Sequence, residues 1–164
     1  MNSSESHFNS FRWNSTWGVI ALLLIYAVVW LTQLSHISLS PPVDNLEQLT
    51  WMRSLEWGYY KHPPAPTWML AGIVSILGWS AMTSYLLGAS LTLSAIFFYW
   101  DVVRKLRGPH VAMLSLLAAL CITFYSNRLY YYNHNIVLMF CISSSAWVFV
   151  RIIEEEKLSL WLTL

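Results

Sequence analysis

The sequence predicts an all-α, polytopic membrane helix bundle with an external loop that carries an amphipathic surface helix. Apolar residues make up 57 % of the chain and charged residues only 10 %, against about 25 % charged residues in typical soluble domains. Apolar runs long enough to span the hydrocarbon of a bilayer recur along the chain. Between the first two runs, residues 41–68 hold five of the six prolines and three of the ten tryptophans, a composition that suits water or the membrane interface.

Charge and cysteine content exclude several classes of protein. The net charge is +1, and the nine Lys and Arg residues form no basic stripe, so nothing indicates a nucleic acid partner. Cys121 and Cys141 each lie inside an apolar run. Their spacing supports neither a disulfide nor a metal site, and we interpret them as small residues that face lipid or the core.

The chain begins with a polar tail over residues 1–16, followed by the first predicted span over residues 17–34. This run is uncharged, with Trp and Tyr toward its ends, as in membrane spans. A cleaved signal peptide is the competing interpretation. It is disfavoured because the start of the chain is not clearly basic and no small-x-small cleavage site follows.

The external loop covers residues 35–80. Pro41 and Pro42 interrupt any helix, and apolar residues then recur at every third position: Leu46, Leu49, Met52 and Leu55. This spacing predicts an amphipathic helix over residues 46–57 at the membrane surface, ended by Gly58. The Tyr-Tyr-Lys-His-Pro-Pro segment after it is expected to be extended, because residues before proline avoid the helical region.

Residues 67–77 are apolar, but the run is too short for a typical span. Further spans are predicted over residues 81–103, 109–127 and 136–153, and residues 158–164 look like the start of another. Residues 17–157 would then be the N-terminal part of a larger membrane domain, either as a fragment or as a truncated gene product.

Basic residues orient the predicted spans. Arg104, Lys105 and Arg107 form the densest cluster outside the tail, and the positive-inside tendency places them in the cytoplasm. If residues 67–77 do not cross, the loop around Asp44 and the loop over residues 128–135 both lie outside. We therefore expect the two polar loops to meet at one end of the bundle.

Asp44 and Glu47, three residues apart, are the main candidates for chemistry. Their spacing fits a helix N-cap with its capping-box partner. It fits equally a carboxylate that faces a surface pocket, as a general base or as a ligand of a divalent cation. The two interpretations are compatible, because a capping position also fixes a carboxylate.

The other candidates are polar and aromatic residues of the two loops: Tyr59, Tyr60, Lys61, His62, Arg128, Asn133, His134 and Asn135. Each could be an interfacial anchor. Alternatively, the tyrosines could stack on a sugar or a lipid carrier, and Arg128 could snorkel or bind a phosphate. The sequence contains no Gly-rich phosphate loop, zinc spacing or Ser-His-Asp order, so these residues alone leave the function open.

The run Asp44-x-x-Glu47 followed by LEWGYYKHPPAPTW resembles the first external loop of polytopic glycosyltransferases of the C superfamily. It is most similar to the bacterial relatives of the protein O-mannosyltransferases (family 39) and to the lipid A aminoarabinose transferases. The likeness continues through the basic turn over residues 104–108 and the second loop, NRLYYYNHNIVLMF. It covers most of residues 17–157, and its first loop is the specific part.

The resemblance implies transfer of a sugar from a polyprenyl-phosphate-linked donor to a glycan, lipid or protein acceptor, with inversion at the anomeric carbon. The protein would be a multi-pass protein of the bacterial inner membrane with its active face in the periplasm. Asp44 would be the base, Glu47 a cation-binding or supporting residue, and Lys61, Arg128 and His134 would meet the donor phosphate. No cofactor follows beyond a candidate divalent cation.

Two departures from the family pattern concern the charge of the site. Where relatives often carry a second acidic residue before the fourth span, this chain has Asn133-His134-Asn135, and Asn135 is the expected equivalent. Some relatives have a glutamate where this chain has Lys61 or His62. The alternatives to a transferase are a non-catalytic membrane module that binds a lipid carrier and an inactive truncated fragment.

Overall fold

The computed structural model describes residues 15–38, 40–155 and 158–162, and within them it is entirely helical, without β-strands. Three helices are long and apolar enough to cross a membrane: α1 (Thr16–Ile37), α4 (Ala81–Arg107) and α7 (His134–Glu155). The two shorter ones have 22 residues, or about 33 Å at 1.5 Å per residue. The predicted class, an all-α membrane helix bundle, is confirmed. Residues 1–14 of the predicted tail lie outside the described residues.

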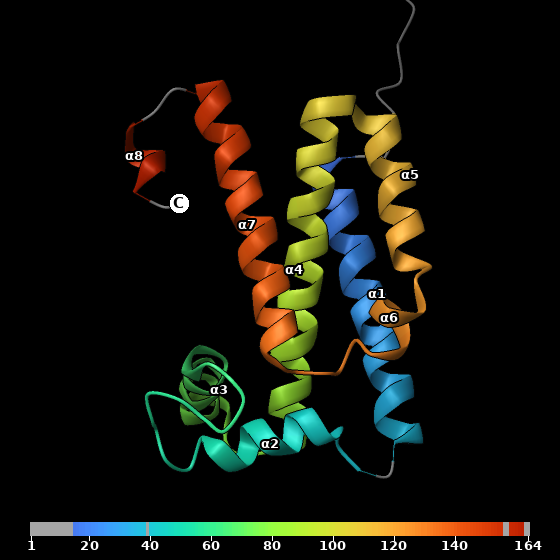
Figure 1. The fold of residues 1–164 in the computed structure, drawn as a ribbon. Coiled ribbons are helices and arrows are strands. Elements are labelled where there is room, and N and C mark those ends of the chain that lie inside the picture. Colours follow the sequence, from blue (N-terminus) through green and yellow to red (C-terminus); the bar gives the residue numbers. More distant parts are fainter. Residues whose placement is uncertain (1–14, 39, 156–157, 163–164) are drawn as a thin grey trace, which may run out of the picture.

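α4 is the central helix of the bundle (Figure 1). It packs against α7, α5 (Pro109–Leu120) and α1. Trp100 on α4 and Leu116 on α5 are fully buried in the cluster that joins α1, α4 and α5. Each long helix keeps apolar side chains exposed on its outer side, as expected for surfaces that face lipid.

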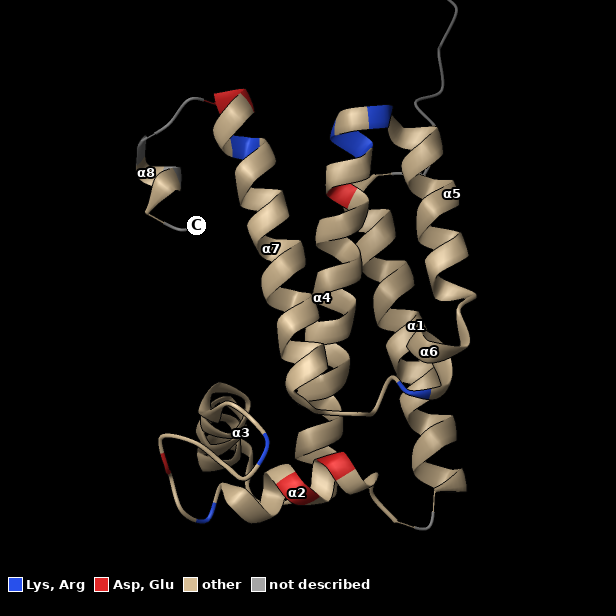
Figure 2. Ribbon diagram, in the orientation of Figure 1, with Lys and Arg blue, Asp and Glu red and all other residues tan. Residues whose placement is uncertain are grey.

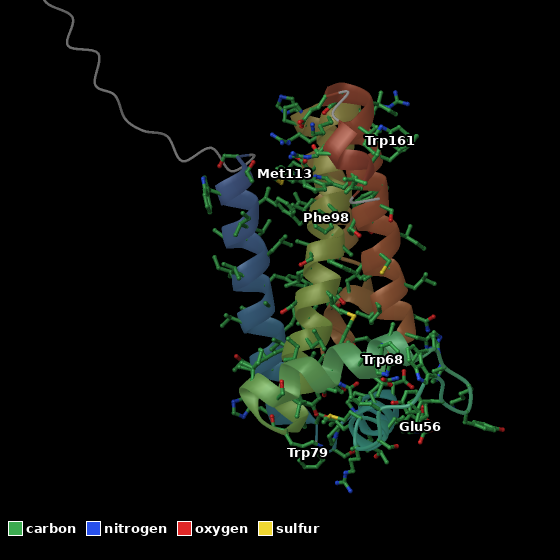
Figure 3. The ribbon with its side chains drawn as sticks, turned by 90° about the vertical axis from the view of Figure 1, so that its left-hand side faces the viewer. Glu56, Trp68, Trp79, Phe98, Met113 and Trp161 are labelled. Carbon is green, nitrogen blue, oxygen red and sulfur yellow. The ribbon has the colours of Figure 1, made fainter. Side chains whose placement is uncertain are left out.

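The external loop folds into two short helices, α2 (Val43–Trp51) and α3 (Pro64–Leu77). Both lie at one end of the bundle, across the direction of the long helices (Figures 1 and 3). This arrangement agrees with the interpretation that residues 67–77 do not run through the bundle. A second buried cluster, with Leu49, Leu70 and Ile136, joins α2, α3 and the first turn of α7.

The predicted surface helix over residues 46–57 is wrong in its bounds and in its buried face. α2 ends at Trp51, and turns follow it instead of a helix that continues to Gly58. Its buried face consists of Asn45, Gln48 and Leu49, whereas Leu46 is 44 % exposed. Periodicity could not predict this, because two amides with partners on other elements take positions that a simple amphipathic helix gives to apolar residues.

The region predicted as one span, residues 109–127, is divided into two helices. α5 ends at Leu120, Ile122 has extended backbone, and α6 (Thr123–Asn127) follows. α5 is shorter than a typical span, so a membrane crossing over residues 109–127 stays a prediction. α8 (Leu158–Trp161) covers part of the predicted further span, whose residues 163–164 lie outside the described residues.

Both ends of the bundle carry residues of both charges, but the candidate carboxylates and the densest basic cluster lie at opposite ends (Figure 2). α2, with both of its acidic residues, lies at the end where α4 begins. The basic residues Arg104, Lys105 and Arg107 lie at the opposite end, in the last turn of α4. Gly108 follows with φ of 86°, a conformation that favours glycine, and lets the chain turn directly into α5.

Candidate functional site

Asp44 and Glu47 lie on the same side of α2, one turn apart. The predicted capping box is wrong: Pro42 is the N-cap of α2 and makes no side-chain hydrogen bond, and Asp44 is already in the first turn. The Asp44 carboxylate is therefore directed to another element. A negative charge in the first turn still interacts favourably with the helix dipole.

The partner of Asp44 is Asn133, in the second polar loop. Asn133 Nδ2 donates a 2.7 Å hydrogen bond to Asp44 Oδ2. Asn133 Oδ1 in turn accepts from the backbone N–H of Ile136 at 3.1 Å, which caps the first turn of α7. The expectation that the two loops meet at one end of the bundle is thus confirmed, and Asn133 joins the acidic residue of one loop to the helix that follows the other.

Glu47 faces the Tyr59–His62 segment. Its carboxylate lies 3.2 Å from Lys61 Nζ and 3.9 Å from His62 Nε2. The Lys61 side chain is 53 % exposed and that of Glu47 27 %, so the ion pair is largely screened by solvent. Glu47 is thus ion-paired at the surface with a side chain of its own loop.

His62 and His134 form a ring pair beside the acidic residues. Their ring centroids are 4.1 Å apart with an interplanar angle of 31°. The ring of Trp51, the last residue of α2, has its centroid 5.4 Å from that of His62. Burial, followed by the nearby His134 and Lys61, lowers the pKa of His62 below its ordinary value of 6.5. The Nδ1 atoms of both rings are buried, and neither has a hydrogen-bond partner within the described part of the chain.

Of the other predicted site residues, Tyr59 lies at the edge of this group, and Tyr60, Arg128 and Asn135 lie apart from it. Tyr60 is 96 % exposed, and the ring of Tyr59 stacks on Trp51 at 5.3 Å. Arg128 is exposed, with its guanidinium 5.2 Å from the centre of the Tyr131 ring. Asn135, the expected equivalent of a second acidic residue, is exposed in the first turn of α7, and Asn133 is the amide that contacts Asp44.

Sequence reasoning missed Asn45, the residue that fixes the two loops together. Asn45 is fully buried. Its Nδ2 donates to Ser84 Oγ at 2.9 Å and to the Tyr130 carbonyl at 3.0 Å, and its Oδ1 accepts from the Tyr132 N–H at 3.0 Å. These bonds connect α2, α4 and the second loop next to Asp44. The available signal was an amide placed directly after the candidate carboxylate.

Further buried contacts complete this framework. Thr67 donates to Gln48 Oε1 at 2.7 Å, and the Tyr132 hydroxyl donates to the Pro66 carbonyl at 2.6 Å. Gly88 of α4 lets the second loop approach closely, because an added Cβ would lie 2.1 Å from the Tyr131 carbonyl oxygen. The Asp44–Asn133 pair is thus supported on a rigid base.

The group combines a carboxylate held by one amide, an ion-paired glutamate and two imidazoles whose Nδ1 atoms have no partner among the described residues. A carboxylate in this setting can accept a proton from a hydroxyl, and Lys61 together with the N-terminus of α7 can attract an anion. Within the described residues, no group of three or more His, Cys, Asp or Glu side chains is arranged to hold a metal ion.

One of the comparisons with known proteins produced a match. A family model described as "Dolichyl-phosphate-mannose-protein mannosyltransferase" matches residues 61–164. The match includes Lys61, His62 and the second loop. It does not include α2, the helix that carries Asp44 and Glu47. No curated protein and no solved structure matches the chain.

Proposed function

The chain belongs to the dolichyl-phosphate-mannose-protein mannosyltransferase family, and from this membership we propose that it transfers a sugar from a polyprenyl-phosphate-linked donor to an acceptor at the outer face of the membrane. The family is one of glycosyltransferases, and the three long apolar helices make the chain an integral membrane protein. The identity of the carrier and acceptor, the bacterial inner membrane and the periplasmic face belong to the proposal.

Asp44 is the proposed general base. The observation that carries this assignment is the 2.7 Å bond from Asn133, which positions the carboxylate between the two polar loops. In the described part of the chain this is the one hydrogen bond that the Asp44 side chain makes. The second carboxylate oxygen is therefore available to accept the proton of an acceptor hydroxyl as that hydroxyl attacks the anomeric carbon.

The leaving phosphate gains negative charge during transfer, and positive groups near it would stabilise that charge. The proposed contacts are Lys61, in the loop between α2 and α3, and His134, the first residue of α7. Arg128 is proposed with less geometric support, because its guanidinium lies over Tyr131 and makes no contact with Asp44 or Glu47 among the described residues.

The proposed orientation follows from charge. Arg104, Lys105 and Arg107 lie at the end of the bundle opposite to Asp44 (Figure 2). With this basic end in the cytoplasm, the site faces outward. Cysteine labelling of the full-length protein from outside should then reach a site near Asn133 and leave a site near Lys105 unlabelled; the reverse pattern would contradict the orientation.

The test of the proposed reaction uses the full-length gene, with the Asp44→Asn variant assayed for sugar transfer in membranes. Asn at this position keeps the size of the side chain but cannot take a proton, so transfer should fall about 10²–10⁴-fold. The matched control is Glu56→Gln, which changes an exposed carboxylate of the same loop. Unchanged transfer by Asp44→Asn would disprove its role as the base.

A non-catalytic module that binds the lipid carrier is the alternative. It is favoured by the neutral Asn133 and Asn135 where relatives often carry a second acidic residue. The same membranes distinguish the two functions, because a pure lipid binder retains the polyprenyl phosphate and yields no glycosylated product even with Asp44 intact.

A further inference from the structure

The loop between α2 and α3 has two different sides. Its inner side contacts the candidate site through Tyr59, which stacks on Trp51, and His62, which lies against His134. Its outer side consists of Leu55, Trp57 and Tyr60, which are 64 %, 88 % and 96 % exposed. Large apolar and aromatic side chains displayed together at this level of exposure indicate a partner.

Hydrogen bonds within the loop between α2 and α3 hold its conformation. The Tyr59 hydroxyl donates to the Ser54 carbonyl at 2.8 Å and accepts from the Glu56 N–H at 3.2 Å. Tyr59 and His62 exchange two backbone hydrogen bonds of 3.2 Å. Because these bonds fix the backbone, the outward direction of Trp57 and Tyr60 is a defined property of the fold.

Trp68 of α3 extends this surface. Its indole N–H donates to the Glu56 carbonyl at 3.0 Å, and its ring meets Trp57 edge-on at 5.1 Å. Trp68 lies in the second turn of α3, and Trp79 follows its C-cap, Gly78. Both tryptophans and Glu56 lie at the end of the bundle that α3 crosses (Figure 3). The exposed side chains of α3 and its C-terminal turn include Ile76, Leu77 and Trp79.

The residue types of this surface favour a lipid bilayer over a sugar as its partner. Trp and Tyr prefer the headgroup level of a bilayer, and Arg53, whose guanidinium lies 5.6 Å from the centre of the Trp79 ring, can meet lipid phosphates. Aliphatic Leu55, Ile76 and Leu77 suit the boundary of the acyl chains and offer a sugar neither stacking nor hydrogen bonds. The surface lies at the end of the bundle, where α3 packs against α4 and α7.

We infer that the outer side of residues 53–60, with the exposed face of α3, is a membrane-binding surface that inserts into the headgroup region of the bilayer. The inference rests on the membrane location of the bundle and not on the proposed transfer reaction. Since the same loop carries Lys61 and His62, lipid contact at its outer side also steadies these two residues over Glu47.

The test uses spin labels on the full-length protein, in which Cys121 and Cys141 are replaced by serine. Labels attached at Trp57→Cys or Tyr60→Cys are compared with a reference at Thr50→Cys, on the exposed face of α2. In vesicles of phosphatidylethanolamine and phosphatidylglycerol, the ratio of accessibility to oxygen over a water-soluble nickel chelate should be several-fold higher at positions 57 and 60. All three sites are exposed, so the substitutions do not disturb the core.

Equal ratios at the three positions would overturn the inference. A second pair of variants tests the effect on the site through a label at Lys61→Cys. Trp57→Ser with Tyr60→Ser should make this label more mobile in vesicles, and Trp57→Phe with Tyr60→Phe should leave it as it is, because phenylalanine keeps the apolar ring. Equal mobility in both pairs would contradict the steadying effect. Neither measurement depends on sugar transfer.

Discussion

The two ends of the bundle use carboxylates in opposite ways. At the end with the basic residues, Asp101 is only 3 % exposed. It accepts hydrogen bonds from Arg104 and, at 2.8 Å, from the indole N–H of Trp147 on α7. At the other end, Asp44 has a single amide partner, and solvent reaches the group around it. A carboxylate with all its partners joins helices, whereas one with few partners is available for chemistry.

The charged residues around Asp101 and around Asp44 also come from different kinds of structural element. Lys105 pairs with Glu154, and Arg151 pairs with Glu155 at 3.6 Å and lies over the Trp147 ring at 4.1 Å. These contacts link or line α4 and α7, both of which are regular helices. The groups around Asp44 instead come from loops and helix ends, which is where binding residues are concentrated in proteins.

The largest expected effect is that of Gly88→Ala. The new methyl group would overlap the Tyr131 carbonyl oxygen, since the added Cβ would be 2.1 Å from it. The second loop must then move away from α4, at a cost of about 3 kcal/mol, and the Asp44–Asn133 bond is lost with it. Thermal unfolding and transfer by the full-length protein should both decline.

Gly72→Ala is the matched control, because nothing lies within 4 Å of an added Cβ at that position in α3. Helix propensity predicts no loss and up to about 1 kcal/mol of stabilisation. If the two alanine variants unfold at the same temperature, the close contact between α4 and the second loop is contradicted.

The next effect concerns the opposite end. Asp101→Asn removes the charge that Arg104 neutralises and should destabilise the bundle by about 1–3 kcal/mol. Because the change is far from Asp44, transfer per folded molecule should stay as it is. A large decrease in transfer at unchanged melting temperature would show that this end also takes part in the reaction.

A smaller effect is expected on acidification. The pKa of His62 is lowered in the folded protein by burial and by His134 and Lys61, so the folded state favours neutral His62. The corresponding stability is complete above the ordinary value of 6.5, and it is lost as the pH falls through the lower folded value. The protection of residues 59–62 against hydrogen exchange, relative to unprotected amides at the same pH, should decrease in that range, and His62→Gln should remove the step.

The smallest effect is expected for the ion pair of Glu47. Lys61→Gln should change the free energy of unfolding by less than about 1 kcal/mol, because the pair is exposed. Its effect on transfer should be larger than its effect on stability if Lys61 meets the donor phosphate. Lys105→Gln, which breaks a pair at the other end, is the control that should leave transfer unchanged.

The sequence was sufficient for the fold class and for the meeting of the two loops, because apolar length and basic clustering are properties of composition and order. It was insufficient for the register of α2, since the buried positions of Asn45 and Gln48 depend on Ser84 and Thr67, which are distant in the chain. For the same reason, spacing suggested that Asp44 caps its own helix, and the family resemblance pointed to Asn135 as the equivalent amide, whereas Asn133 is the residue that contacts Asp44.

The most direct test of the difference between the two ends compares Asp44→Asn with Asp101→Asn in the full-length protein. Both melting temperature and sugar transfer are measured at equal amounts of folded protein. We predict that Asp44→Asn loses transfer about 10²–10⁴-fold with little change in melting, and that Asp101→Asn lowers melting and keeps transfer. Equal loss of transfer in both variants, or full transfer by Asp44→Asn, would contradict the assignment of chemistry to the end that carries Asp44.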